Sequence, residues 1–193
     1  QFLRRTRGVT CHPDQIVIIS GATQGFSLIG KLLLAQDDKV IIEDPITNDI
    51  QTIFRSTGAT LVPIPVDDLG MRTEMISEVE KPKFIFVTPS HQFPLGSTLP
   101  IQRRIQLIQY ARANQCYIVE DDYDSEFRYD GEPISSLQGL DPERVIYIGT
   151  FSKNLSPALR MGYLVLPQDL IERCRNLKWF HDLHTPSLNQ MLD

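Results

Sequence analysis

The sequence predicts an α/β protein, a three-layer α/β/α sandwich around a mostly parallel sheet of seven strands. Two observations support this prediction. Short apolar, β-branched runs alternate along the chain with longer segments whose apolar residues recur at helical spacing. The strand candidates also lack the alternation of apolar and polar residues that is typical of a sheet with one face in water, so helices are expected on both faces.

Seven runs are the predicted strands. They are QIVIIS (15–20), KVIIED (39–44), ATLVPIPV (59–66), KFIFVTP (83–89), CYIVEDD (116–122), VIYIGT (145–150) and GYLVLP (162–167). Only a short connection, FSKNLSPALRM, separates the last two. Because such a connection is short for a crossover helix, the last strand is expected to run antiparallel to its neighbours.

Helical patterns occupy the segments between the strands. Residues 23–36 carry apolar residues at helical spacing. Residues 99–115 do the same, with Ile101, Ile105 and Ile108 on one face and Pro100 in a first-turn position. After Pro167 a further amphipathic pattern begins, with apolar positions at Leu170, Cys174 and Leu177.

Composition narrows the class of protein. A chain of 193 residues with 41% hydrophobic and 22% charged residues is typical of one soluble globular domain. Its net charge of -5 offers no basic surface for nucleic acid or an anionic membrane, so this segment alone is expected not to bind DNA. No apolar run has membrane-spanning length, and the start lacks the apolar region of a signal peptide. We expect a segment of a longer chain.

The three cysteines, Cys11, Cys116 and Cys174, are odd in number and widely spaced. This pattern argues against a disulfide framework or a zinc ribbon and favours a reducing cytoplasm, with the thiols acting as small buried hydrophobic groups.

The candidate site lies where the strands end. In open α/β sheets ligands bind at the carboxyl ends of the strands. Those ends are polar here: SGATQG (20–25), EDP (43–45), TPSHQFPLG (88–96), EDDYDSEF (120–127) and GTFSK (149–153). The first opens a predicted helix, whose free backbone N–H groups at Gly21, Ala22 and Thr23 suit an anion such as phosphate.

Two other motifs are weaker. Gly25, Gly30 and Lys31 match the spacing of an NTPase phosphate loop, but Leu32 replaces the Ser or Thr that holds magnesium, and the segment is an apolar helical pattern. The acidic run 121–126 fails the calcium-loop pattern, because Phe127 stands where glycine is required.

A zinc site at the histidine pair of HDLH (181–184) lacks a further ligand. No metal is therefore expected.

Charged residues end two buried strands. Asp121 and Asp122 close the apolar run CYIV, where an unpaired carboxylate is costly and requires a cationic partner. Lys153 follows strand 145–150 and lies seven residues before Arg160. A lysine held near another cation in a poorly solvated pocket has a lowered pKa and becomes an amine nucleophile toward an aldehyde.

Together these motifs resemble the large domain of fold type I pyridoxal-phosphate (PLP) enzymes, the aminotransferase group. VTPSHQFPLG, VEDDYDSEFRYDG and IGTFSKNLSPALRMGYLVLP resemble, more narrowly, the aminotransferase-like domain of MocR/GabR-type regulators of the GntR family. The resemblance covers nearly the whole chain. It implies that residues 1–193 form a single large, cofactor-binding domain, with a winged helix upstream and a small domain downstream of this chain.

The resemblance also implies a role for each site residue. Lys153 forms the Schiff base with the cofactor aldehyde, and Asp121 keeps the pyridine nitrogen protonated. Asp122 is the alternative partner of the nitrogen; Asp-x-Tyr spacing in the family favours Asp121. Tyr123 donates a hydrogen bond to the phenolic oxygen. The phosphate is held by Thr150, Ser152, Arg160 and the N–H groups around Gly21, Ala22 and Thr23.

Three departures from the family pattern stand out. Thr47 occupies the position where an aromatic residue commonly stacks on the pyridine ring. The family's NPTG asparagine has no match in HQFPLG, which leaves His91, Gln92 or Phe93 to line that wall. The arginine that grips a substrate carboxylate belongs to the small domain, beyond Asp193. Turnover by this chain alone is therefore not expected.

Three functions remain open. The first is an effector-sensing module of a cytoplasmic transcriptional regulator that binds a small amino compound, forms a homodimer and contacts DNA only through its upstream domain. The second is a fragment of a free-standing class I/II aminotransferase. The third is a nucleotide-binding α/β domain without PLP, in which Lys153 is dispensable for ligand binding.

Overall fold

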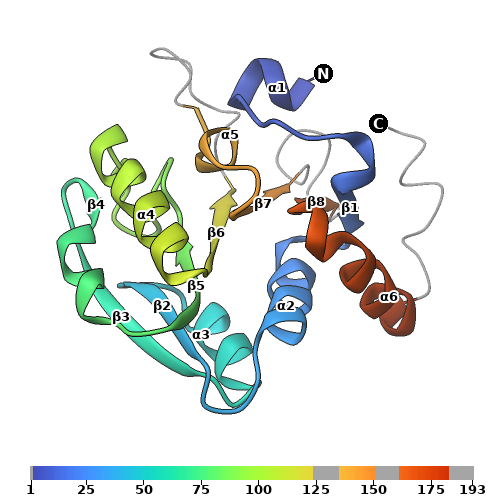
Figure 1. Cartoon of the computed structure of the whole chain (residues 1–193), viewed down its shortest axis with the longest axis horizontal. Coiled ribbons are helices and arrows are strands. Elements are labelled where there is room, and N and C mark those ends of the chain that lie inside the picture. The colour runs from blue at the N-terminus through green and yellow to red at the C-terminus, as the bar shows by residue number, and fades with distance from the viewer. Residues whose placement is uncertain (1, 124–134, 151–160, 183–193) are drawn as a thin grey trace.

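The computed structural model of the protein describes residues 2–123, 135–150 and 161–182 (Figure 1). One sheet of eight strands, in the order β1-β8-β7-β6-β5-β2-β3-β4, forms the middle layer of this described part. The strands are β1 (Ile16–Ile19), β2 (Lys39–Asp44), β3 (Thr60–Asp67), β4 (Gly70–Met71), β5 (Pro82–Val87), β6 (Tyr117–Asp122), β7 (Val145–Thr150) and β8 (Gly162–Val165).

The sheet is mostly parallel, as the sequence predicts. Strands β7, β6, β5, β2 and β3 pair in parallel, and β8 runs antiparallel to both β7 and β1. The predicted fold class and the reversed last strand are therefore confirmed. One strand was not predicted: β4 pairs with β3 through Val66 and Asp67, and two residues are too few to show a strand pattern in the sequence.

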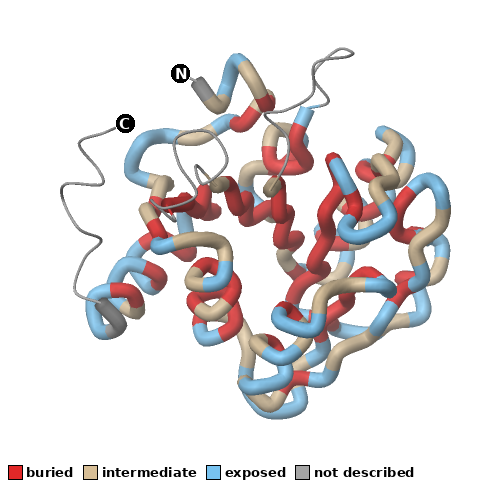
Figure 2. Tube along the Cα trace, turned by 180° about the vertical axis from the view of Figure 1, so that it is seen from behind, coloured by how far each residue is buried: buried red, intermediate tan, exposed pale blue. Residues whose placement is uncertain are grey.

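Helices cover both faces of the sheet. They are α1 (Phe2–Arg7), α2 (Ala22–Leu33), α3 (Asn48–Arg55), α4 (Ile101–Asn114), α5 (Leu137–Leu140) and α6 (Ile171–Asp182), with 3-10 turns at Pro13–Gln15, Thr73–Glu78 and Gln168–Leu170. Helices α2, α3 and α6 share one apolar core with the sheet, and α4 and α5 share a second core on the opposite face. Figure 2 shows the buried strands between these layers.

Helix α2 lies directly on β1 and β8. A Cβ atom at the buried Gly25 would come within 2.9 Å of Ile19 Cδ1 and 3.2 Å of Leu164 Cδ2, so glycine permits this close packing. The whole G-x-x-x-x-G-K run lies inside this helix, which excludes a phosphate loop at these residues. The close packing also brings the first turn of α2 to the carboxyl edge of the sheet.

Helix α4 turns a different face to the sheet from the predicted apolar stripe. Ile101 and Ile105 are 49% and 45% exposed, while the inward positions are Arg104, Leu107 and Ala111. The guanidinium of Arg104, which is only 1% exposed, donates hydrogen bonds to three backbone carbonyls. The acceptors are Leu99, Pro89 and Ser135. A charged residue can occupy this core position because each carbonyl supplies an acceptor.

The C-terminal amphipathic prediction is confirmed. Leu170 and Cys174 are buried, and Leu177 packs partly buried against the same core. Cys116 is also buried, whereas Cys11 is half-buried; all three thiols are free. No helix within the described residues has the length and apolar character needed to cross a membrane.

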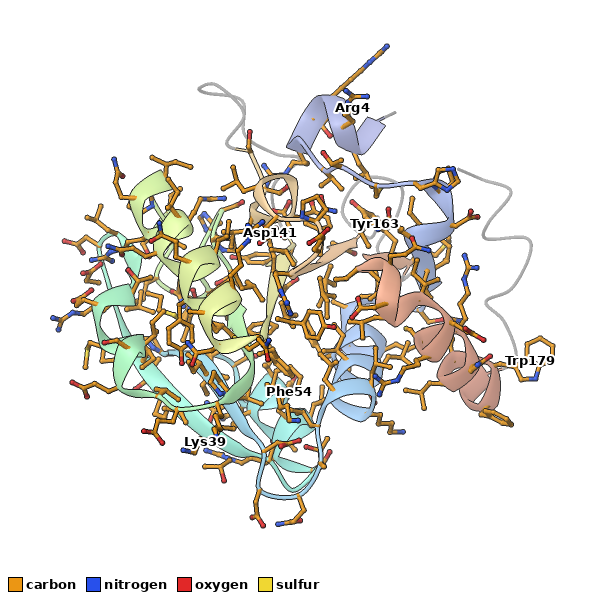
Figure 3. The ribbon with its side chains drawn as sticks, viewed as in Figure 1. Arg4, Lys39, Phe54, Asp141, Tyr163 and Trp179 are labelled. Carbon is orange, nitrogen blue, oxygen red and sulfur yellow. The ribbon has the colours of Figure 1, made fainter. Side chains whose placement is uncertain are left out.

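Gly149 in β7 is the sharpest test of this packing. A Cβ there would lie 2.2 Å from Cζ of the buried Tyr163, which is labelled in Figure 3. The ring of Tyr163 stacks with that of Tyr147, which is also buried. We expect Gly149→Ala to lower the free energy of unfolding by roughly 1–3 kcal/mol, because the buried ring must move. The measurement is unfolding in urea, monitored by circular dichroism.

Gly30→Ala is the matched control for this substitution. Its Cβ would make an ordinary contact, 3.4 Å from Thr57 Cγ2, and alanine in a helix interior is favoured over glycine by about 0.5–1 kcal/mol. Equal stability of the Gly149→Ala variant and the wild type would contradict the packing described.

Candidate active site

The candidate site lies at the carboxyl edge of the parallel strands. Strand β2 ends in Glu43 and Asp44, β6 ends in Asp121 and Asp122, and β7 ends in Thr150. Because these strands are parallel and adjacent to β5 or to one another, their ends meet at one edge of the sheet.

The two aspartates at the end of β6 face opposite sides of the sheet. Successive side chains of a strand point to opposite faces, so Asp121 shares its face with Val119, a member of the core under α2, α3 and α6. Asp122 faces the other way. Its Oδ2 accepts hydrogen bonds from Arg7 Nε, at 2.7 Å, and from the Tyr147 hydroxyl.

Asp121 has no such partner in the described part of the chain. It is 7% exposed, and no hydrogen bond from residues 2–123, 135–150 or 161–182 reaches its carboxylate. Burial raises its pKa to about 8, and the neighbouring negative charges of Asp122, Glu43 and Glu120 add to the shift. A cation placed beside Asp121 would favour its ionised form and so lower this pKa.

Glu43 and Glu120 are buried carboxyl groups with hydrogen-bond donors. Burial raises the pKa of each to about 7, although the hydrogen bonds that each accepts lower it. Thr88 donates to Glu43 Oε2 through its hydroxyl at 2.6 Å and its N–H at 3.2 Å. Glu120 accepts the N–H groups of Leu137 and Gln138 at 3.0 Å each, at the start of α5. These donors hold the two carboxyl groups in place behind the site.

The first turn of α2 supplies an anion site on the same face as Asp121. Gly21, the N-cap residue, has a φ of 89°, a conformation that favours glycine, and no side chain of the described residues caps the helix. The N–H groups of Ala22 and Thr23 follow directly in the first turn. Gln24 Oε1 instead accepts the N–H of Ser20, at 2.7 Å. Free N–H groups and the helix dipole together favour a bound phosphate.

Three rings gather on the loops that follow β5 and β6. The centroids of His91 and Phe93 lie 6.1 Å and 6.0 Å from that of Tyr123, both in edge-on geometry. Gln92 fixes this loop: its Nε2 donates to Pro45 O at 3.0 Å, and its Oε1 accepts the N–H of Leu95. Phe93 is 46% exposed, so this wall presents an aromatic surface at the edge of the site.

The remaining predicted residues divide into two sets. Thr47, half-buried, precedes α3 as its N-cap residue, and the Thr150 hydroxyl donates to Met161 O at 3.3 Å. Both lie at the carboxyl edge described above. Lys153, Ser152 and Arg160 fall outside the described residues.

The polar residues that support the site show no pattern in the sequence. Nothing in the sequence distinguishes Arg7 from the two other arginines near the N-terminus. Its burial at 4% exposure, with Asp122 as partner, is visible only in the folded chain. The sequence predicts Gln92 as one of the residues that line the wall of the site. Its hydrogen bond to Pro45 O, which joins two loops, depends on the folded chain.

Comparison with known proteins assigns the family. The model of the family "Aminotransferase class I and II" matches residues 1–186, so the chain belongs to the class I and II aminotransferase family. The family predicted from the motifs is thereby confirmed.

Particular relatives refine this assignment. The chain is 45% identical over 174 residues to the uncharacterized HTH-type transcriptional regulator YdeL of Bacillus subtilis, covering 90% of this chain and 37% of YdeL. It is 40% identical over 173 residues to the probable rhizopine catabolism regulatory protein MocR of Rhizobium meliloti, covering 89% of this chain and 35% of MocR. The chain thus spans little more than a third of either regulator.

Among solved structures, the chain resembles Pyrococcus horikoshii kynurenine aminotransferase, crystallised with PMP, its substrate and its product. The TM-score is 0.91 at 33% sequence identity, covering 98% of this chain and 49% of that enzyme.

Replacing Asp121 tests whether the pKa of its carboxyl group is raised in the folded chain. Because its pKa is raised in the folded chain, the folded chain keeps a proton that the unfolded chain loses. The resulting stability is present below the ordinary pKa, near 4, and is lost as the pH rises through about 8. Asp121→Asn removes this pH-dependent loss. Without ligand, we therefore expect the free energy of unfolding of the variant to rise relative to that of wild type by roughly 1–3 kcal/mol as the pH increases from 5 to 8.

Urea unfolding at several pH values measures this difference. Asp68→Asn, which removes an exposed carboxylate, is the control and should show no such trend. A constant difference between Asp121→Asn and wild type across this range would show that Asp121 ionises normally.

Proposed function

We propose that this chain is the cofactor-binding part of a PLP-binding, aminotransferase-like, effector-sensing domain in a MocR/GabR-type transcriptional regulator. The single observation that carries the cofactor proposal is that two groups on one face of the sheet have no partner in the described part of the chain. They are the buried Asp121 carboxylate and the first turn of α2. An anion and a cation on one small planar molecule would satisfy both.

The residues present fit this cofactor. A carboxylate beside the pyridine nitrogen keeps that nitrogen protonated, and Asp121 is available for this because Asp122 is already bonded to Arg7 and Tyr147. The N–H groups of Gly21, Ala22 and Thr23 suit the phosphate. PMP in the similar kynurenine aminotransferase structure supports the same class of cofactor.

Each further residue has a proposed task. Lys153 supplies the amine that carries the cofactor, and Tyr123 donates a hydrogen bond to its phenolic oxygen. Thr150, Ser152 and Arg160 complete the phosphate site, Arg160 through charge-assisted hydrogen bonds. Thr47 and His91 lie at the edge of the ring, where Phe93 and Tyr123 exclude water. When bound, PLP supplies an aldehyde that captures amines and a ring that withdraws electrons.

Sensing is favoured over catalysis by the relatives. Both similar regulators carry names of transcriptional control, and both are more similar in sequence to this chain than the kynurenine aminotransferase is. The proposed effector is a small amino compound, because an amine is what the cofactor aldehyde captures. A homodimer in the cytoplasm, with DNA bound by a separate upstream domain, completes the proposal.

A free-standing aminotransferase is the second candidate. It is supported by the kynurenine aminotransferase, which has the same fold over 98% of this chain. In the full-length protein, release of a keto acid and an amino acid product from an amino donor and a keto acid would favour the enzyme. Binding of an amino compound without product would favour the sensor.

The cofactor proposal predicts one site of labelling. The purified chain is mixed with PLP, its visible absorption is recorded, and borohydride reduction fixes the cofactor to the amine that holds it. We expect the label on Lys153 in peptide mapping and no visible band in Lys153→Ala. Lys31→Ala, which removes an exposed lysine of α2, is the control and should be labelled like wild type. A label scattered over surface lysines would refute the PLP site.

A further inference from the structure

The N-terminal segment reaches the back of the candidate site through one buried side chain. Arg7, the last residue of α1, is 4% exposed. Its Nε donates to Asp122 Oδ2 at 2.7 Å, and its Nη2 donates to Ser90 Oγ at 2.7 Å. Its own carbonyl accepts the N–H of Ser136 at 2.9 Å. One residue of α1 therefore holds the end of β6, the loop after β5 and the start of α5.

The residues that Arg7 contacts are the chain neighbours of two proposed site residues. Asp122 is the neighbour of Asp121 in β6, and Ser90 is the neighbour of His91 in the loop after β5. The contacts of Arg7 therefore fix the two backbone segments that carry Asp121 and His91. Tyr147, stacked on Tyr163, supplies the second donor to Asp122.

The ion pair between Arg7 and Asp122 also affects the charge around Asp121. Two adjacent buried carboxylates repel each other, and Asp122 is among the causes that raise the pKa of Asp121. The positive charge of Arg7 offsets the negative charge of Asp122. Asp121 is then the carboxylate of this pair that lacks a counter-charge among the described residues.

We propose that Arg7 is a positioning residue of the cofactor pocket. By pairing with Asp122 it leaves Asp121 as the carboxylate available to a cationic ring nitrogen, and through Ser90 it holds the loop that carries His91. This inference rests on the proposed PLP site and concerns a residue that does not touch the cofactor.

Binding of pyridoxine 5'-phosphate, measured by calorimetry at neutral pH, tests this role. The compound keeps the ring and the phosphate but lacks the aldehyde, so its affinity reports the ring and phosphate contacts without Lys153. We expect Arg7→Met to weaken binding at least about tenfold and Arg7→Lys, which keeps the charge, to recover part of the loss. Arg4→Met is the matched control on the same helix, since Arg4 is exposed and points away from the molecule (Figure 3).

The double variant Arg7→Met with Asp122→Asn separates two roles of Arg7: neutralising the charge of Asp122 and holding the neighbouring segments in place. It removes both members of the pair, so we expect its affinity to return to within about threefold of wild type. Thermal unfolding of each variant without ligand records the loss of anchoring separately. Ser90→Ala removes the loop contact while leaving the charge pair, and is expected to weaken binding by a few-fold.

Two results would overturn the proposal. Wild-type affinity in Arg7→Met, with only a lower unfolding temperature, would make Arg7 a structural anchor. A double variant as weak as Arg7→Met would exclude the charge-balance role. In either case borohydride labelling of Lys153 in the wild type would persist, whereas failure of that labelling would refute the PLP site itself.

Discussion

The buried carboxylate of Asp121, at the end of strand β6, is the constraint on which the rest of the site depends. Desolvation makes the ionised form of Asp121 costly, and no donor in the described residues relieves that cost. Asp122, one residue further, has both a guanidinium and a hydroxyl. The fold thus gives one carboxylate a charged partner and, within the described residues, leaves the other without one.

Side chains alternate between the two faces of a strand, so Asp121 and Asp122 can have different surroundings. Adjacent residues of β6 face different layers, so α1 and β7 serve Asp122 while the layer of α2 faces Asp121. Helix α2 can bring its uncapped first turn to the same edge because Gly25 allows it to lie close on Ile19 and Leu164. Packing in the core therefore sets the distance between the proposed phosphate site and the proposed nitrogen partner.

Much of this arrangement could be predicted from the sequence. Buried parallel strands are continuous apolar runs, so all seven predicted strands are present, with boundaries close to those observed. The clustering of strand-end residues follows from topology alone, which is why Asp121, Tyr123, Thr150 and the 21–23 turn were identified together.

The remainder depends on contacts that sequence patterns do not encode. Helix α4 buries Arg104 in place of part of its isoleucine stripe, because three carbonyls from separate segments converge on that guanidinium. The different partners of Asp121 and Asp122 likewise follow from the approach of Arg7, 115 residues away in the chain. In both cases a long-range hydrogen bond to a buried charge overrides the local pattern.

The most direct test of this account is a crystal structure of the chain with bound PLP. The account predicts that the ring nitrogen lies within hydrogen-bonding distance of Asp121, that the phosphate lies at the first turn of α2, and that Asp122 keeps its contacts with Arg7 and Tyr147. A ring nitrogen bonded to Asp122, or a cofactor bound away from this edge of the sheet, would contradict it.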